Sequence, residues 1–293
     1  MLDLSFRTGV LCAFLAAVLF GMISVVAKPT VAAVNPILLS AFVYLIGAAT
    51  MTGIAGVRFP RVGKRHYLLL VASGISGGVI APLLYFFGLS QTTASDTSVI
   101  SNSEIVFSII LAILFFREKV KRRGYLAMLL VFAGIFLVAT DLRFSGSAFD
   151  LNVGNMLILA SSVFWGIDNN ISRMLTKRFE NSAKIAQLKS AIGGGILFCI
   201  VLAMQIPIMA DASQIPSIIL LGAGGFAASL FFFLSALRRI GTVKTILIFS
   251  LFSPIGLAAS AVFLHEEIGM YQIAATVMMI LGIYLVLKTT KQT

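Results

Sequence analysis

Long apolar segments separated by short polar clusters repeat along the whole chain. Five occupy residues 8–27, 36–57, 67–89, 95–116 and 124–140, and five more occupy 153–175, 183–206, 215–237, 242–264 and 270–287. About 20 apolar residues in a helix cross a hydrocarbon core about 30 Å thick. The segments are about twice as long as a barrel strand and lack its period-two alternation. The pattern therefore predicts an all-α integral membrane protein with ten transmembrane helices.

The composition excludes a water-soluble globular protein. Of the 293 residues, 59% are hydrophobic and 11% are charged, and the mean hydropathy is +1.03. A soluble domain has about 25% charged residues, more than twice this share. Cys12 and Cys199 both lie in apolar segments without metal-ligand or disulfide-like spacing, which favours packing roles.

The second set of five segments resembles the first set when shifted by about 145 to 148 positions. The matching stretches are 16–21 with 161–166, Lys28 with Arg173, 115–118 with 263–266, and 134–138 with 282–286. Five is an odd number, so the second unit must be inverted in the membrane relative to the first. The sequence therefore predicts two inverted five-helix repeats, over residues 8–140 and 153–288.

The net charge of +11 comes from basic residues between the apolar segments. If the N-terminus is cytoplasmic, the inner loops collect Arg58, Arg61, Lys64, Arg65, Arg117, Lys119, Lys121, Arg122, Arg123, Arg173, Lys177, Arg178, Lys184, Arg238, Arg239 and Lys244, which leaves Lys28 and Arg143 outside. Positive loops favour the cytoplasmic side and face anionic lipid. This distribution predicts a multi-pass cell-membrane protein with both termini in the cytoplasm, and it disfavours a nucleic-acid partner.

The chain resembles the EamA family of the drug/metabolite transporter superfamily. The resemblance rests on Leu19-Phe20-Gly21, on Phe164-Trp165-Gly166, and on the end of each repeat, where Glu118 or Glu266 precedes Gly134 or Gly282 by sixteen residues. It implies a transporter of small metabolites, often an exporter of amino acids, with a central cavity between the two halves. Pro254 matches the family pattern in the second repeat, whereas the first repeat has Glu104-Ile105-Val106-Phe107 in place of Glu-Pro-Val-Phe.

The fourth segment contains a polar stripe around Glu104. Helical spacing places Ser101, Glu104 and Ser108 on one face, with Asn102 at its margin. A charged side chain in mid-membrane costs about 2.5–3.5 kcal/mol on insertion scales, so it faces protein or water. The stripe predicts a substrate-binding wall. Close helix packing by small serines, with a neutral and hydrogen-bonded Glu104, is the alternative.

The sixth segment has Trp165, Asp168 and Asn169 at spacings of three and four. An aromatic ring beside a carboxylate and an amide can hold a cationic or zwitterionic compound. An interfacial tryptophan with polar interhelical contacts is the alternative. Lys189 is expected to extend toward the inner surface, and a pair with Asp168 or Glu104 is the second possibility. Tyr85 is a further candidate for the pathway.

No nucleotide, metal or cofactor motif is visible, and catalysis is not expected. The string Gly74-Ile75-Ser76-Gly77 resembles an intramembrane serine protease motif, but the two histidines, His66 and His265, lie at helix ends on opposite predicted sides. Asp96 is expected to cap the fourth helix. We expect a small-molecule substrate, such as an amino acid, and lipids as partners, and leave the oligomeric state open. A non-transporting receptor or lipid-handling scaffold is the alternative function.

Overall fold

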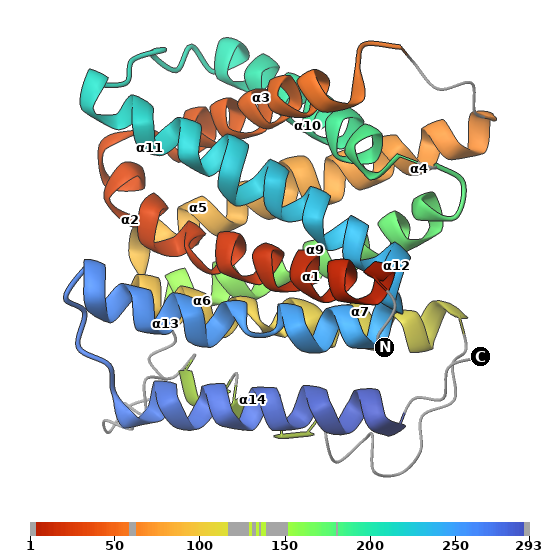
Figure 1. Ribbon diagram of the computed structural model, residues 1–293. Coiled ribbons are helices and arrows are strands. Elements are labelled where there is room, and N and C mark those ends of the chain that lie inside the picture. Colours follow the sequence, from red (N-terminus) through yellow and green to blue (C-terminus); the bar gives the residue numbers. More distant parts are fainter. Residues whose placement is uncertain are drawn as a thin grey trace.

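The computed structural model describes residues 4–58, 63–116, 129–130, 133–134, 136–138, 152–179 and 181–289 (Figure 1). The first half contains α1 (Leu4–Gly21), α2 (Ile23–Ala33), α3 (Pro36–Ala55), α4 (Lys64–Ile75), η1 (Ser76–Ile80), α5 (Ala81–Gln91), α6 (Ala94–Ser101) and α7 (Ser103–Phe116). The second half contains α9 (Val153–Thr176), α10 (Ser182–Ala203), η2 (Ala212–Gln214), α11 (Ile215–Ile219), η3 (Leu220–Ala228), α12 (Ser229–Phe249), α13 (Phe252–Phe263) and α14 (Met270–Thr289).

The predicted all-helical architecture is confirmed for the part of the chain that these ranges cover. There, helices cover nine of the ten predicted segments, and the fifth segment, 124–140, lies mostly outside the described residues. Six helical stretches, of which four join consecutive elements, are long and apolar enough to cross a membrane: Leu4–Ala33, Pro36–Ala55, Lys64–Gln91, Ser182–Ala203, Ala212–Gly241 and Lys244–Phe263. Gly241, at φ 76°, separates the last two within α12.

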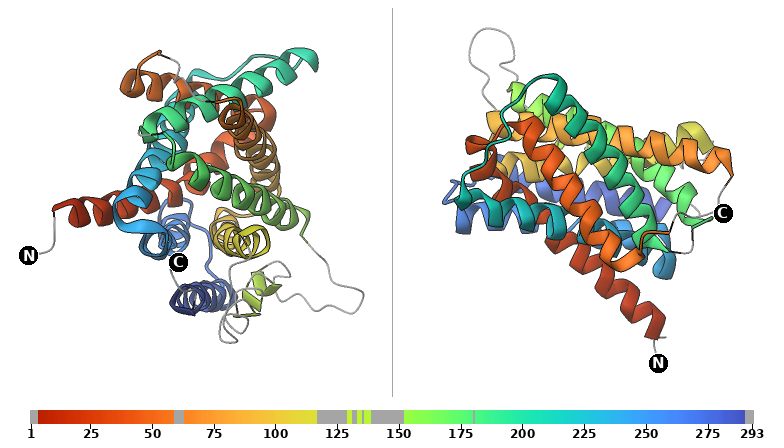
Figure 2. Two further views of the ribbon diagram at one scale, coloured as in Figure 1. Left: turned by 90° about the vertical axis from the view of Figure 1, so that its right-hand side faces the viewer. Right: turned by 90° about the horizontal axis from the view of Figure 1, so that it is seen from above.

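The two halves pack against each other along most of their length. The most extensive helix contacts join α3 to α10, α1 to α12, and α9 to both α5 and α7. Small residues permit the close approach. A Cβ on Gly193 of α10 would lie 2.6 Å from the carbonyl oxygen of Gly78, and a Cβ on Gly154 of α9 would lie 2.8 Å from that of Gly88. Figure 2 shows α3 and α10 on one side of the bundle and α14 on the opposite side.

Both halves interrupt their helices at matching positions. The third and eighth predicted segments each contain a π-helical turn, η1 and η3, in a glycine-rich stretch. In the fourth segment the N–H of Ile105 donates to the carbonyl of Asn102 at 3.2 Å, three residues back. The N–H of Ser253 donates to Ser250 in the same way at 3.4 Å. The interruption at Asn102 forms without a proline, although Pro254 lies near its counterpart.

Thr93, rather than Asp96, is the N-cap of α6, so the predicted cap was wrong. The Thr93 hydroxyl accepts the N–H of Asp96 at 3.1 Å. Glu266, from the other half, accepts the N–H groups of Ala94 and Ser95 at 2.9 and 2.8 Å. Asp96 lies one turn into the helix and accepts Gln272 Nε2 at 2.6 Å.

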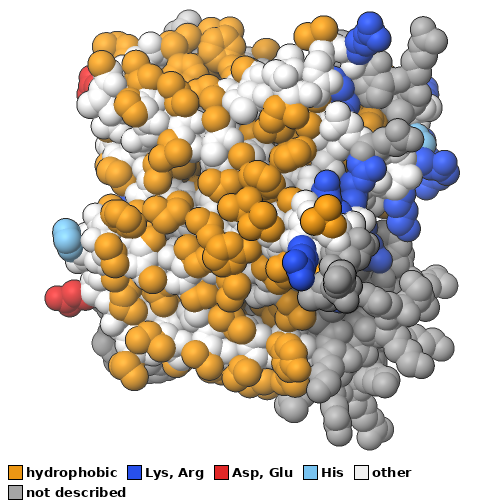
Figure 3. Space-filling model, in the orientation of Figure 1, with side chains coloured by type: hydrophobic (Ala, Val, Ile, Leu, Met, Phe, Trp, Pro, Cys, Tyr) orange, Lys and Arg blue, Asp and Glu red, His pale blue; other side chains and the backbone are white. Residues whose placement is uncertain are grey.

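Exposed basic side chains gather at one end of the bundle, where α1 begins and α14 ends (Figures 1 and 3). They include Arg7, Arg58, Lys64, Arg65, Lys177, Arg178, Arg238, Arg239 and Lys244. Acidic and histidine side chains appear at the opposite end in Figure 3. The helix arrangement thus brings together the basic loops that the sequence assigns to the cytoplasm.

This arrangement predicts the outcome of cysteine labelling. In a background with Cys12→Ala and Cys199→Ser, cysteines introduced at Lys64 or Arg178 should react with a membrane-impermeant maleimide only after the cells are opened. A cysteine at Asp211 or Gly269 should react in intact cells, because these positions follow α10 or precede α14 at the opposite end. Labelling of both sets from the same side would contradict the topology.

Candidate functional site

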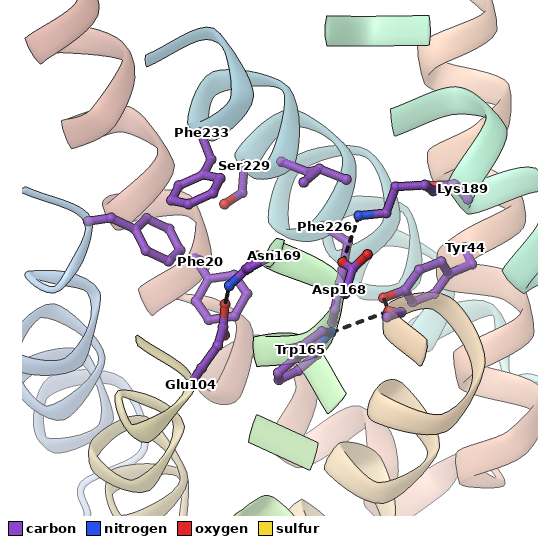
Figure 4. A pocket seen from close by; sticks show the side chains of 14 residues that line it. Phe20, Tyr44, Glu104, Trp165, Asp168, Asn169, Lys189, Phe226, Ser229 and Phe233 are labelled. Carbon is purple, nitrogen blue, oxygen red and sulfur yellow. Dashed lines mark hydrogen bonds and ion pairs between the residues drawn. The ribbon is translucent and has the colours of Figure 1, made fainter. Parts of the chain in front are cut away.

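A cavity of about 70 Å³ lies between the two halves, lined by residues of α1, α3, η1, α7, α9, α10, η3 and α12 (Figure 4). A buried water needs about 10–15 Å³, so several waters or a small ligand group can fit. The lining residues are Phe20, Tyr44, Gly77, Glu104, Trp165, Asp168, Asn169, Lys189, Ser190, Phe226, Ser229, Leu230, Phe233 and Phe249. Five of these, Glu104, Trp165, Asp168, Asn169 and Lys189, are residues singled out from the sequence.

Helix α9 supplies three of these side chains and begins where Asn152 accepts the N–H groups of Gly154 and Asn155. Trp165 donates its Nε1–H to the carbonyl of Gly77 at 3.3 Å. The Tyr44 hydroxyl donates to the same carbonyl at 2.6 Å. This carbonyl belongs to the π-helical turn η1, so an irregular backbone orients the tryptophan and the tyrosine together.

Asp168 and Lys189 form a buried ion pair at 2.6 Å. Their side chains are only 8% and 4% exposed. The hydroxyls of Ser73 and Ser172 also donate to Asp168, and Lys189 donates to Ser172 at 2.8 Å. The expectation that Lys189 extends to the inner surface was wrong, because a carboxylate on the neighbouring helix holds its ammonium group inside the bundle. The second possibility, a pair with Asp168, is the arrangement observed.

Glu104 lies on the α7 wall, next to α9. Its Oε1 accepts Asn169 Nδ2 at 2.7 Å, and its Oε2 is buried without a hydrogen-bond partner. Asn169 also donates to the Ser108 hydroxyl at 3.2 Å. With both carboxylates ionised and Lys189 protonated, the cavity walls carry a net charge of −1. Glu104, a residue that lines the cavity, therefore has one buried acceptor without a donor.

Aromatic rings cover much of the remaining wall. Phe20 packs 5.8 Å from Trp165 and 5.3 Å from Phe249, between ring centroids. Phe226 lies 6.3 Å from Trp165, and Phe233 lies 4.8 Å from Phe249. The sequence analysis did not select these four phenylalanines as site residues, since an apolar helix gives no signal that separates a cavity-facing ring from a lipid-facing one.

Four predicted site residues do not line the cavity. Tyr85 lies behind Trp165, with its ring centroid 5.2 Å away. Ser108 contacts Asn169, as described above. Ser101 and Asn102 are buried, and neither the Ser101 hydroxyl nor either atom of the Asn102 amide has a partner. Among the residues that the structure describes, there is no group of three or more His, Cys, Asp or Glu that could hold a metal ion.

These features define a multi-pass membrane protein with a charged and aromatic cavity between two helical halves. The sequence profile of the EamA-like transporter family matches the chain twice, over residues 7–140 and 152–288. The chain belongs to this family and is a membrane transporter of that kind.

Two curated relatives are similar along most of their length. An uncharacterized transporter of Methanothermobacter thermautotrophicus is 27% identical over 286 residues, covering 92% of this chain and 83% of that protein. The uncharacterized transporter YyaM of Bacillus subtilis is 24% identical over 273 residues, covering 88% and 86%. A solved crystal structure shares the fold, with a TM-score of 0.69 at 17% identity, covering 95% of this chain and 96% of the other.

The ion pair predicts an asymmetric response to mutation. Lys189→Met leaves the buried Asp168 charge without its cation and should destabilise the protein by about 3–5 kcal/mol. The double variant Asp168→Asn, Lys189→Met removes both charges and should recover most of that loss. Unfolding in detergent with increasing SDS measures both, with the exposed Lys177→Met as control. Equal losses in the single and double variants would contradict a stabilising charge pair.

Gly77 predicts a second effect, since a Cβ at this position would lie 2.3 Å from Asp168 Oδ2 and 2.8 Å from Asp168 Cβ. Gly77→Ala should therefore displace Asp168 and lower the unfolding midpoint. Gly195→Ala is the matched control, because a Cβ there meets nothing within 4 Å. It should be neutral or stabilising by up to about 1 kcal/mol, as Ala favours helix more than Gly. Similar midpoints for the two variants would contradict the close packing.

Proposed function

We propose that this transporter exports amino acids or closely related amphipathic metabolites across the cell membrane, the direction that the family resemblance implies. The observation that carries the proposal is that one aromatic cavity is lined by a residue with an unpartnered acceptor and by another with an unpartnered donor. Glu104 has one carboxylate oxygen without a partner. Lys189 uses two of its three N–H groups, on Asp168 and Ser172, and keeps one.

A zwitterion satisfies both groups. Its ammonium can donate to Glu104 Oε2, and its carboxylate can accept the remaining proton of Lys189, in charge-assisted hydrogen bonds. The two residues come from different walls of the cavity in Figure 4. The net charge of −1 on the walls also admits a monovalent organic cation, which the faces of Trp165 and the phenylalanines would stabilise by cation–π attraction.

The rings favour a substrate with a large apolar part. Phe20, Phe226, Phe233 and Phe249 give no hydrogen bonds, so a purely polar metabolite would lose its hydration against them without compensation. An aromatic or branched aliphatic side chain would bury apolar surface there at about 25 cal/mol per Å². We therefore expect hydrophobic amino acids or their amines to bind more tightly than small polar ones.

Alternating access is the proposed mechanism. Both halves contribute residues to the cavity. Rocking of inverted repeats around a site of this kind would expose it to each side in turn. The basic end of the bundle would face the cytoplasm, with both chain ends on that side.

A receptor or lipid-handling scaffold is the alternative function. A scaffold has no need for an open polar cavity, and its buried charges would be expected to pair fully, since an unpaired carboxylate oxygen in the bilayer is costly. The free oxygen of Glu104 in the cavity wall favours transport over this alternative.

Binding and flux should depend on Glu104 in a predictable way. Glu104→Gln removes one charge-assisted hydrogen bond, worth about 1.5–3 kcal/mol, so the affinity for an amino-bearing substrate should fall at least about tenfold. A thermal-shift panel of amino acids, amines and nucleosides on purified protein identifies the ligand, and uptake into proteoliposomes then measures flux. Glu267→Gln, the same change at an exposed position, is the control.

Two results would contradict the proposal. Ligands that stabilise the protein but never cross the proteoliposome membrane would favour a receptor. Full affinity of the Glu104→Gln variant for every stabilising ligand would show that the amino group does not bind at this carboxylate.

A further inference from the structure

The fourth membrane segment is interrupted at Asn102, inside the bundle. Helix α6 ends at Ser101 and α7 begins at Ser103, and Asn102 makes three-residue backbone bonds on both sides, to Val99 and from Ile105, at 3.1 and 3.2 Å. Asn102 keeps right-handed helical dihedrals, φ −63° and ψ −17°, so the helix tightens locally at this residue and does not unwind.

Four consecutive residues at the interruption carry buried polar atoms without partners. The atoms are Ser101 Oγ, Asn102 Oδ1 and Nδ2, Ser103 Oγ, and Glu104 Oε2. Their residues are at most 5% exposed, and Asn102 and Ser103 are 0% exposed. A buried polar atom without a partner costs about 1–3 kcal/mol. Such a concentration of unsatisfied polar atoms within one turn of a buried helix indicates a ligand.

Helices packed against α6 add further unpartnered hydroxyls near the same level. On α9, Gly154 lies against Thr92 and Gly166 lies against Ser108, so Ser161 falls about midway, beside the interruption. Its Oγ is buried and has no partner.

Two helices on the other side of α6, α13 and α14, also carry buried hydroxyls without partners. Glu266, which follows α13, accepts the N–H of Ala94, and Gly256 of α13 lies against Ser98. Ser253 therefore continues this antiparallel register toward Ser101. On α14, Gln272 bonds Ser95 and Asp96, which places Thr276 one turn further inward. The hydroxyls of Ser253 and Thr276 are also buried without partners.

The chemistry of these groups selects the ligand. Hydroxyl, amide and carboxylate oxygens are hard donors that suit a hard cation. Lys189 neutralises Asp168, so Glu104 provides one negative charge, and a divalent ion would leave an uncompensated positive charge in the bundle. A proton on Glu104 would satisfy that carboxylate and leave the oxygens of Ser101, Asn102 and Ser103 without partners.

We infer that the segment around Asn102 is a binding site for a sodium ion, held by oxygens of Ser101, Asn102 and Glu104. Glu104 also lines the cavity. If the proposed function holds, the substrate's ammonium and the sodium ion compete for Oε2, and the transporter exchanges one for the other. Sodium binding itself does not depend on the proposed function.

Radioactive sodium binding to the purified full-length protein tests the site. Wild-type protein in choline chloride should bind about one sodium ion per chain saturably, and its unfolding midpoint should rise when sodium replaces choline at constant ionic strength. Asn102→Leu and Glu104→Gln should each lower the sodium affinity at least tenfold. Asn170→Leu, the same change at an amide that bonds the Ser108 and Gly166 carbonyls instead, should leave sodium binding intact.

Two outcomes would overturn the inference. Absence of saturable sodium binding in the folded wild-type protein, or binding that survives in the folded Glu104→Gln variant, would exclude the site. Sodium-independent binding and flux of a substrate found in the thermal-shift panel would remove the exchange but leave the proposed function standing. Sodium binding without any transported substrate would leave the sodium site standing and would contradict the proposed function.

Discussion

A charge inside a bilayer needs a partner from the protein, and this requirement determines how the centre of the bundle is built. Asp168 and Lys189 would each cost about 2.5–3.5 kcal/mol alone in mid-membrane. Together they hold α9 against α10, and the Ser73 hydroxyl adds α4. The missing side chain of Gly77 leaves the space that Asp168 occupies. Four elements are thus fixed around one ion pair, and the cavity forms beside it.

The irregular helix backbone also shapes the cavity. In the π-helical turn η1 the N–H of Ala81 bonds the carbonyl of Ser76, five residues back. The N–H that would bond Gly77 in the same way is missing, because residue 82 is proline, and the Gly77 carbonyl accepts Tyr44 and Trp165 instead. The same kind of turn in η3 carries Phe226 on the facing side. The aromatic part of the cavity therefore depends on helix distortions that both halves contain at corresponding places.

The sequence predicted the polar side of this cavity better than the apolar side. Glu104, Trp165, Asp168 and Asn169 could be selected because a charged, amide or indole group is unusual within an apolar segment. Phe20 and Phe249 could not be selected, since the chain has 24 phenylalanines and an apolar helix favours rings on every face. The direction of Lys189 was misjudged because its place early in α10 is compatible with both the surface and the interior. Helix limits followed from hydropathy, while the interruptions at η1, η3 and Asn102 depend on tertiary packing.

Comparison of matching positions in the two halves explains why the cavity has two chemically different walls. At a shift of 145, Trp165 and Asp168 correspond to Phe20 and Ile23, and at a shift of 148, Glu104 corresponds to Phe252. Phe20 packs 4.9 Å from Phe252 between ring centroids, so the counterparts of Trp165 and Glu104 form an aromatic contact. The two halves thus differ in side-chain chemistry at these matching positions, and of the three apolar counterparts Phe20 lines the cavity. A ligand that contacts the charged wall and the apolar wall at once needs both polar and apolar groups, in whichever direction it is transported.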